Sequence, residues 1–245
     1  MIVYGKNVFN QIKEDPQSVS EVYILDSLKD KKLRDSVKTL KCPVRSVSRK
    51  ELDTLTGNGI HNGIAVKVKD IPTYSLDELL ARKKSQGPGL YVALDNIQDP
   101  HNVGSILRTA DCTGVDGIIL CRHNSAGLTP TVVKTSTGAA YTVPVAIVNN
   151  LSQALKKMKE EGYWIAGADM DHARDYREGM YDAPTVLVIG SEGKGISPLV
   201  KKQCDYMVRL PMAGSISSLN ASVACAVLLY EIMNQRDPLP KKNDR

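Results

Sequence analysis

The chain has 245 residues, of which 42% are hydrophobic and 24% are charged, and its formal net charge is +5. The length suits one large or two modest domains, and the composition is that of a soluble globular protein, which excludes fibrous and disordered classes. No apolar run approaches the ~20 residues of a membrane-spanning helix and the N-terminus has no signal-peptide pattern, so we expect a cytoplasmic protein without a membrane partner.

The positive charge is concentrated in the first third of the chain. Residues 1–86 hold 16 lysine and arginine residues against 11 acidic residues, whereas residues 87–245 hold 16 of each. Such an asymmetry is expected where the first third binds a polyanion such as a nucleic acid. A solvated basic face without any ligand would give the same count, and both interpretations stay open at this point.

The cysteines give no sign of a metal site or of a disulfide framework. The chain has an odd number of them, none forms a CxxC pair, and none lies at ligand spacing from a histidine. The pattern predicts reduced thiols and no bound metal. The five residues are Cys42, Cys112, Cys121, Cys204 and Cys225.

The first 70 residues are predicted to form a small α/β domain. Hydrophobic spacing predicts helices at residues 5–12, 31–40 and 49–55, and short apolar runs predict strands at residues 22–25, 44–47 and 64–68. Because strands and helices alternate, we expect a mostly parallel sheet with helices packed on it. Residues 71–88 are mostly polar and contain Pro72, the basic run at 82–84 and Gly87-Pro88, so we expect a linker there, with a short helix at 75–83.

Residues 89–245 are predicted to form a second, larger α/β domain, an open sheet with ligands bound at the carboxyl ends of its strands. The expected strands are 91–94, 117–120, 143–148, 164–168, 185–189 and 206–210. The expected helices are 103–112, 129–137, 151–161, 198–204 and 219–233.

Three of these strands are followed by loops of unusual composition. The loop after residues 91–94 continues as NIQDPHNVGSILRTA at 96–110, and the strand at 185–189 is followed by GSEGKG at 190–195. The third reads LPMAGSISSLNASVA at 210–224, where small residues precede an almost uncharged helix. Glycines allow a ligand to approach the backbone, and a helix N-terminus offers free N–H donors.

Two common nucleotide-binding motifs are excluded by the same stretches. A Walker A motif requires Ser or Thr after Gly-Lys, and Lys194 is followed by Gly195. A Rossmann GxGxxG does not follow the strand at 91–94. The sequence therefore predicts neither an NTPase nor a dinucleotide-dependent dehydrogenase.

Together the three loops resemble the three signature motifs of the SpoU (TrmH) family of SPOUT RNA 2′-O-ribose methyltransferases. All three occur in the family's order and spacing and cover the second domain. The first 70 residues, with Tyr4-Gly5 and His61-Asn62-Gly63-Ile64, resemble the family's L30e-like RNA-binding domain, although Asn62 stands where Gln is expected. The two-domain layout is most similar to bacterial enzymes that methylate a guanosine of 23S ribosomal RNA.

The resemblance implies a fold, a cofactor and an assembly. The fold is an α/β-knot, a mostly parallel sheet whose C-terminal segment forms a trefoil knot, and the assembly is a homodimer with the site at the subunit interface. The methyl donor is S-adenosyl-L-methionine (AdoMet), held in the knot. The residues implied to line its pocket are Thr137, Gly138, Ile189, Gly190, Leu210, Met212, Ser218 and Leu219.

The resemblance also implies the residues that act on the ribose hydroxyl. Arg108 activates it, with the support of Asn102, Glu192, Ser218 and Asn220. Because arginine effectively never loses its proton, Arg108 is equally suited to stabilise a developing alkoxide or to orient a phosphate. Glu192 is expected to hold Arg108 or Asn102, or to act as an acid at a helix N-terminus.

The N-terminal domain is expected to hold folded RNA through phosphates and shape. The candidate RNA-binding residues are Lys6, Lys31, Lys32, Arg34 and Lys41, and each of them also suits a solvated surface. The leading hypothesis is an AdoMet-dependent methyltransferase acting on 23S ribosomal RNA. The alternatives are the same reaction on transfer RNA or another ribosomal site, and an inactive RNA-binding protein of the same fold.

Overall fold

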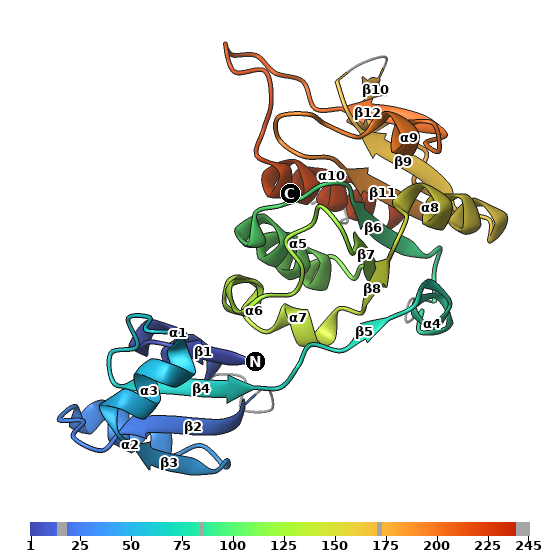
Figure 1. The fold of residues 1–245 in the computed structure, drawn as a ribbon. Helices are drawn as coiled ribbons and strands as arrows, with labels where there is room; N and C mark the ends of the chain where they lie inside the picture. The colour runs from blue at the N-terminus through green and yellow to red at the C-terminus, as the bar shows by residue number, and fades with distance from the viewer. Residues whose placement is uncertain (14–18, 84–85, 171–172, 239–245) are drawn as a thin grey trace, which may run out of the picture.

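The protein folds into two α/β units, each built on its own sheet (Figure 1). The structure is a computed structural model and describes residues 1–13, 19–83, 86–170 and 173–238. The first sheet has the order β1-β4-β2-β3, with strands Ile2–Tyr4 (β1), Val19–Leu25 (β2), Val44–Val47 (β3) and Ile64–Val68 (β4). Its helices are Lys6–Ile12 (α1), Lys31–Lys38 (α2) and Arg49–Thr56 (α3).

The expectation of a mostly parallel N-terminal sheet is wrong. Among the strands of this sheet in the described residues, β2 and β3 are parallel, and β4 runs antiparallel to both β1 and β2. The reason lies in the turn at residues 57–63, which returns the chain to the end of the sheet where α3 began. At that end Asp26 donates a backbone hydrogen bond to Val47 of β3, and Leu25 donates one to Gly63 before β4, at 3.0 Å each. Alternation of elements does not reveal such a return.

In the part of the chain that the structure describes, the second sheet has eight strands, and its neighbouring strands are all parallel. Their order is β10-β12-β9-β11-β6-β7-β8-β5. The six strands expected here are confirmed, and the two others, β5 and β10, have two residues each, which is too short for a hydrophobic period. The strands are Thr73–Tyr74 (β5), Leu90–Leu94 (β6), Gly117–Cys121 (β7), Val145–Val148 (β8), Trp164–Ala168 (β9), Arg174–Asp175 (β10), Thr185–Ile189 (β11) and Tyr206–Arg209 (β12).

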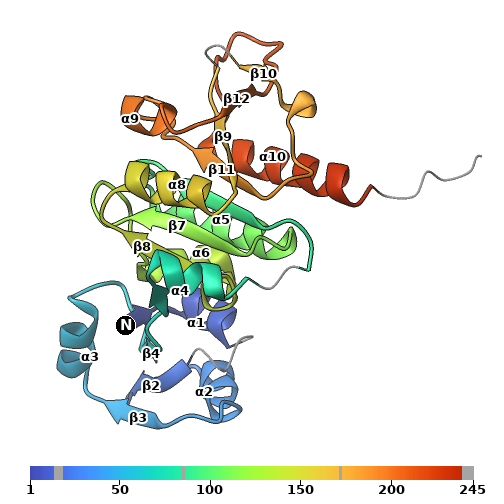
Figure 2. The same cartoon turned by 90° about the vertical axis from the view of Figure 1, so that its right-hand side faces the viewer.

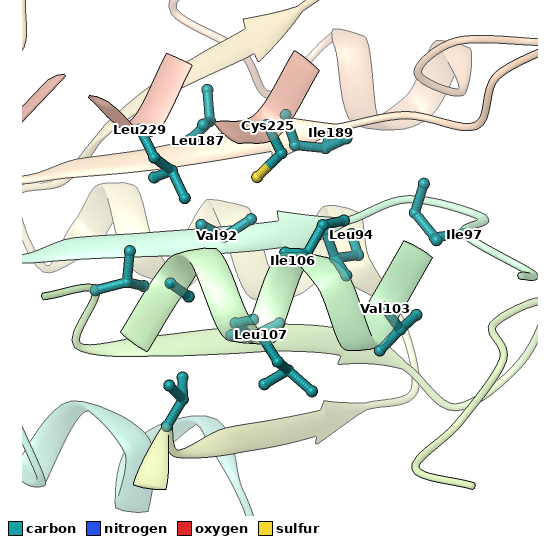
Figure 3. Close-up of a cluster of buried hydrophobic side chains, with 14 of the residues drawn as sticks. Val92, Leu94, Ile97, Val103, Ile106, Leu107, Leu187, Ile189, Cys225 and Leu229 are labelled. Carbon is teal, nitrogen blue, oxygen red and sulfur yellow. The ribbon is translucent and has the colours of Figure 1, made fainter. Parts of the chain in front are cut away.

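Helices cover both faces of this sheet, which is why its central strands are apolar throughout. One buried cluster joins Val92 and Leu187 of the strands to Ile106 of α5 and Leu229 of α10 (Figure 3). A second cluster joins Tyr91 and Val186 of the same strands to α4, α8 and α9. The helices are Leu76–Ala81 (α4), Pro100–Cys112 (α5), Pro130–Ser136 (α6), Ala139–Thr142 (α7), Leu151–Glu160 (α8), Pro198–Lys201 (α9) and Ala221–Arg236 (α10), with a 3₁₀ turn at Tyr176–Glu178 (η2).

Part of the segment expected to be a linker is packed into the second unit. Thr73 and Tyr74 form β5, which pairs with β8 at the edge of the sheet. Leu76 and Leu79 of α4 are buried against that sheet, and the helix starts with a capping box formed by Ser75 and Glu78. The short helix expected at 75–83 is therefore confirmed as α4, whereas no pattern in the sequence predicted β5.

The C-terminal part of the chain is interleaved with the middle of the sheet. β11 lies between β6 and β9, and the chain then crosses to β12 on the outer side of β9. From there it returns so that α10 packs along α5 (Figure 2). As a result, the loops after β6, β11 and β12 meet at one edge of the sheet.

Candidate active site

Three polar side chains from distant loops form a hydrogen-bonded group at this edge, which we call the Asn102–Glu192–Asn220 triad. The side-chain amide of Asn102 donates to Glu192 Oε1 at 2.9 Å. The amide of Asn220 donates to the same oxygen at 2.5 Å and to Asn102 Oδ1 at 2.9 Å. The carboxylate therefore holds two amides that lie 118 residues apart in the sequence.

Two helix N-termini position the amides of the triad. Asn102 is buried in the first turn of α5, which begins with Pro100 and is capped by the side chain of Asp99. Asn220 caps α10, since its Oδ1 accepts from the backbone N–H groups of Ser222 at 3.0 Å and Val223 at 3.2 Å. Because that oxygen faces the helix, the NH₂ group must face the other two members of the triad.

Glu192 belongs to a tight loop that glycines make feasible. The backbones of Ser191 and Gly195 bond to each other in both directions, at 3.1 and 2.8 Å. A Cβ atom at Gly190 would overlap the backbone of Gly195, so the turn excludes any larger residue. Glu192 Oε1 also accepts from the backbone N–H of Ala221 at 3.4 Å, so the carboxylate holds Asn102 and in addition serves as an acid at the start of α10.

A buried carboxylate, which sequence reasoning did not identify, ties two of the loops together. Asp95 directly follows β6, and its Oδ2 accepts from the backbone N–H of Ser197 at 2.6 Å. Its backbone N–H donates to Ile189 of β11 at 2.9 Å. An acid immediately after a wholly apolar strand was the available signal, because a buried charge requires specific partners.

A cavity of about 420 Å³ opens beside the triad and is partly lined by Glu192. Six of the predicted cofactor-binding residues line it, which are Ile189, Gly190, Leu210, Met212, Ser218 and Leu219. Its walls are apolar where β11, β12 and α10 meet and polar where the loops surround it. This volume and this mixture of surfaces fit a nucleoside-sized ligand, with an apolar slot for the flat adenine of AdoMet.

The other two predicted cofactor-binding residues lie elsewhere. Thr137 and Gly138 form the junction of α6 and α7, where both adopt positive φ angles of 50° and 96°. Neither lines the cavity beside Glu192. The strained junction explains the glycine locally, because only glycine adopts such a conformation without cost.

Arg108 is separated from the triad in the single chain. It lies six residues after Asn102 on α5, about 240° further around the helix, and its side chain is exposed. No hydrogen bond or ion pair to it occurs within the described parts of the chain, and it is not among the cavity residues. Ser218 is likewise exposed and lines the cavity without bonding to the triad.

The predicted RNA-binding residues divide into two groups. Lys6 forms an ion pair with Asp30 at 2.8 Å, which lowers the pKa of that carboxyl, and Arg34 donates to the backbone oxygen of Asp26 at 2.7 Å. Both therefore have partners inside the N-terminal unit. The others, Lys31, Lys32 and Lys41, are exposed. Lys31 and Lys32 occupy the first turn of α2, where the helix dipole disfavours cations, so they do not stabilise the helix.

His61 in the second N-terminal motif has a structural role. Its ring is buried, with Nε2 at 2.9 Å from Asp53 Oδ1, and Nδ1 accepts from the backbone N–H of Gly63 at 3.0 Å. The ring thereby fixes the turn into β4.

Within residues 1–13, 19–83, 86–170 and 173–238, no group of three or more His, Cys, Asp or Glu side chains is arranged to hold a metal ion. In the same part of the chain, no helix has the length and apolar character required to cross a membrane.

Comparison with known families gives a match over almost the whole chain. Residues 89–230 match the SpoU rRNA Methylase family, and residues 2–74 match the RNA 2′-O ribose methyltransferase substrate-binding family. A protein of Staphylococcus haemolyticus is 39% identical over 240 residues, which is 96% of each chain, and YacO of Bacillus subtilis is 39% identical over 242 residues, which is 97% of this chain and 96% of YacO. Both are named as TrmH family tRNA/rRNA methyltransferases.

Solved structures show the same architecture. The SpoU methyltransferase AviRb from Streptomyces viridochromogenes, in complex with AdoMet, superposes with a TM-score of 0.75 and 27% identity, covering 96% of this chain and 90% of AviRb. The TrmH/SpoU tRNA modifying enzyme of A. aeolicus has a TM-score of 0.58 and 32% identity. It covers 66% of this chain and 82% of its own.

Proposed function

The chain belongs to the SpoU rRNA Methylase family and is an AdoMet-dependent RNA 2′-O-methyltransferase with the SPOUT α/β-knot fold, and from this premise we propose that it methylates a guanosine of 23S ribosomal RNA. The observation that supports ribosomal RNA is the complete N-terminal unit at residues 2–74, which matches a substrate-binding family. The A. aeolicus enzyme that modifies tRNA covers only 66% of this chain. Because ribosomal RNA of bacteria is made in the cytoplasm, we place the protein there.

Each loop at the sheet edge has a part in this reaction. AdoMet supplies a methyl group on a positively charged sulfur. The apolar walls at Ile189, Leu210 and Leu219 would hold its adenine, and the loop from Gly190 places Glu192 in the lining of the cavity. Glu192 positions the amides of Asn102 and Asn220 so that they orient the ribose of the acceptor nucleotide. Preorganised donors of this kind cost no reorganisation during the reaction.

Arg108 completes the site from a second copy of the chain. In one chain it is exposed, points in a different direction from Asn102 on α5 and does not line the cavity, which supports an action on the cavity of a second copy. Since a guanidinium keeps its proton, its role is to stabilise the negative charge that develops on the 2′-oxygen. Thr137, Gly138 and Ser218 belong to the surfaces that the two copies bring together around the cofactor.

An exposed apolar stripe on α10 supports the homodimer. Val223, Val227, Tyr230 and Met233 lie at helical spacing on one face of α10, with exposed fractions of 48%, 37%, 50% and 37%. Four large apolar side chains on one helix face are unusual for a monomer and typical of an interface core. The opposite face of α10 is buried on α5, so a second copy bound to the stripe would cover the helix on both faces.

The N-terminal unit binds the RNA. Exposed Lys31, Lys32 and Lys41 provide phosphate contacts, while Lys6 and Arg34 support the α2 region from within. The N-terminal unit therefore contributes affinity for the RNA and positions it relative to the active site, and the second unit performs the methyl transfer.

Tritiated AdoMet offered with unmodified 23S RNA, 16S RNA and bulk transfer RNA tests the proposal. We expect label only in 23S RNA, and nuclease digestion should release it as 2′-O-methylguanosine. Label in transfer RNA alone would contradict the assignment of 23S RNA as the substrate, while the assignment of the enzyme class would stand. Label on another nucleotide of 23S RNA would overturn the guanosine assignment.

A further inference from the structure

A charged pair lines the same cavity as Glu192. Lys201 Nζ is 2.7 Å from Asp169 Oδ2, and both residues line the cavity. The Asp169 side chain is only 9% exposed and that of Lys201 is 34% exposed. A carboxylate that is nearly buried at the wall of a ligand cavity is costly to maintain, so its presence there indicates a role in binding.

Three elements hold the pair in place. Asp169 follows β9, and its backbone N–H donates to Val208 of β12 at 3.1 Å. Lys201 is the last residue of α9. Gly195 has a φ of +62°, and a Cβ atom there would lie 3.0 Å from Asp169 Oδ2, so the loop that carries Glu192 also packs against the carboxylate. The loop that carries Glu192 of the triad thus also contacts the pair, through Gly195.

We propose that the Asp169–Lys201 pair binds the two ribose hydroxyls of AdoMet. The inference rests on the cofactor occupying this cavity. Strands β9 and β6 are separated by β11, which places their ends about 10 Å apart. That distance suits a ligand whose ribose faces Asp169 while its reactive methyl group faces the triad.

The chemistry of the pair favours a neutral diol over the amino-acid end of AdoMet. A carboxylate accepts several hydrogen bonds and an ammonium group donates several, so the pair presents both kinds of group that a diol can bond to. The amino-acid end of AdoMet carries an ammonium and a carboxylate group, which would compete with Lys201 for Asp169 and with Asp169 for Lys201. Its binding would therefore require the ion pair to separate. Carboxylates also recognise ribose hydroxyls in other nucleotide-binding sites.

Calorimetric titration with S-adenosyl-L-homocysteine and three of its relatives tests the inference without methyl transfer. The relatives are the 2′-deoxy and 3′-deoxy forms and 5′-methylthioadenosine, which keeps the ribose and lacks the amino acid. We expect Asp169→Asn to reduce the affinity for S-adenosyl-L-homocysteine and the affinity for 5′-methylthioadenosine by the same factor, about 10- to 100-fold. At least one of the two deoxy forms should bind the wild-type protein more weakly than S-adenosyl-L-homocysteine does. Because that form lacks the hydroxyl that Asp169 binds, Asp169→Asn should reduce its affinity little further.

Lys201→Met should reduce the affinity for the same two ligands, and Lys159→Met is its matched control. Lys159 forms an ion pair with Asp205, also at 2.7 Å and with 38% exposure, but does not line the cavity. Its variant should bind like the wild type, and thermal unfolding checks that all variants are folded. If Asp169→Asn weakens S-adenosyl-L-homocysteine but not 5′-methylthioadenosine, the pair recognises the amino-acid end and the inference fails. If the folded wild type binds none of the ligands, the assignment of the cavity to AdoMet fails instead.

Discussion

Asn220 bonds in two directions at once, since its side-chain oxygen caps α10 while its amide nitrogen lies 2.5 Å from Glu192 Oε1. One residue therefore connects the start of the C-terminal helix to the carboxylate of the active site. This arrangement makes the stability of α10 and the geometry of the site separable by mutation, because an aspartate is as good a cap as an asparagine.

Asn220→Asp should abolish activity with little loss of stability. The new carboxylate still caps α10, but it places a negative charge beside Glu192 where a donor is required. We expect methyl transfer to fall by about 100-fold or more, and the unfolding temperature to change by a few degrees at most. The control is Asn150→Asp, which changes the cap of α8 in the same way and should leave activity intact. If the two variants had comparable activity, the assignment of Asn220 to the active site would be wrong.

Gly190→Ala should disrupt the loop that carries Glu192. A methyl group there overlaps the backbone of Gly195, which cannot yield without opening the Ser191–Gly195 bridge. We expect a loss of about 1–3 kcal/mol in unfolding free energy and weaker binding of S-adenosyl-L-homocysteine. Gly193→Ala in the same loop has open space for its methyl group and should be tolerated in both assays. Equal tolerance of both alanines would show that the loop is not rigid.

Arg236→Met should destabilise the second unit without touching the site. Its guanidinium donates to backbone oxygens of Pro88, Tyr181 and Ala183 at 2.8, 2.8 and 2.9 Å, and so fastens the end of α10 to two other segments of the chain. Loss of these bonds leaves half-buried carbonyl groups unpaired. We expect the free energy of unfolding, measured by urea denaturation, to fall by about 2–4 kcal/mol. Arg236→Lys should recover little of it, because lysine lacks the planar fork of donors. Full recovery by lysine would contradict this reading of the geometry.

Arg108→Ala should abolish methyl transfer while the affinity for S-adenosyl-L-homocysteine stays nearly unchanged, because Arg108 lies outside the cavity of its own chain. If it acts from a second copy, mixing this variant with Asn220→Asp should restore activity in the mixed dimers, each of which has one intact site. Light scattering should report a dimer throughout. Absence of recovery in a verified mixed dimer would place both residues in one chain's site.

Lys31→Ala combined with Lys32→Ala should weaken RNA binding and reduce its dependence on salt. Each phosphate contact that is lost lowers the slope of log affinity against log salt by about one. Lys156→Ala, on the exposed face of α8, serves as the control and should alter neither quantity. An unchanged salt slope in the double variant would exclude these lysines from the RNA surface.

The long elements of the fold were predictable because their apolar periods are strong, and the triad was found because its members lie in recognisable motifs. Other features were invisible in the sequence. The direction of β4 depends on a turn, and the two-residue strands β5 and β10 are too short for a pattern. Asp169 and Lys201 lie in segments that match no motif, and only the fold brings them to one cavity. The separation of Arg108 from Asn102 arises from their positions on one helix, which the motif alone does not convey.

The most direct test of the site is Glu192→Gln, measured in single-turnover methyl transfer and in binding of S-adenosyl-L-homocysteine. Glutamine keeps the shape of the side chain and an oxygen that accepts from Asn102 and Asn220, but removes the charge that orients them. We predict that transfer falls by about 100-fold or more while the affinity changes only a few-fold. Transfer at the wild-type rate in the folded variant would contradict the assignment of the Asn102–Glu192–Asn220 triad as the centre of the reaction.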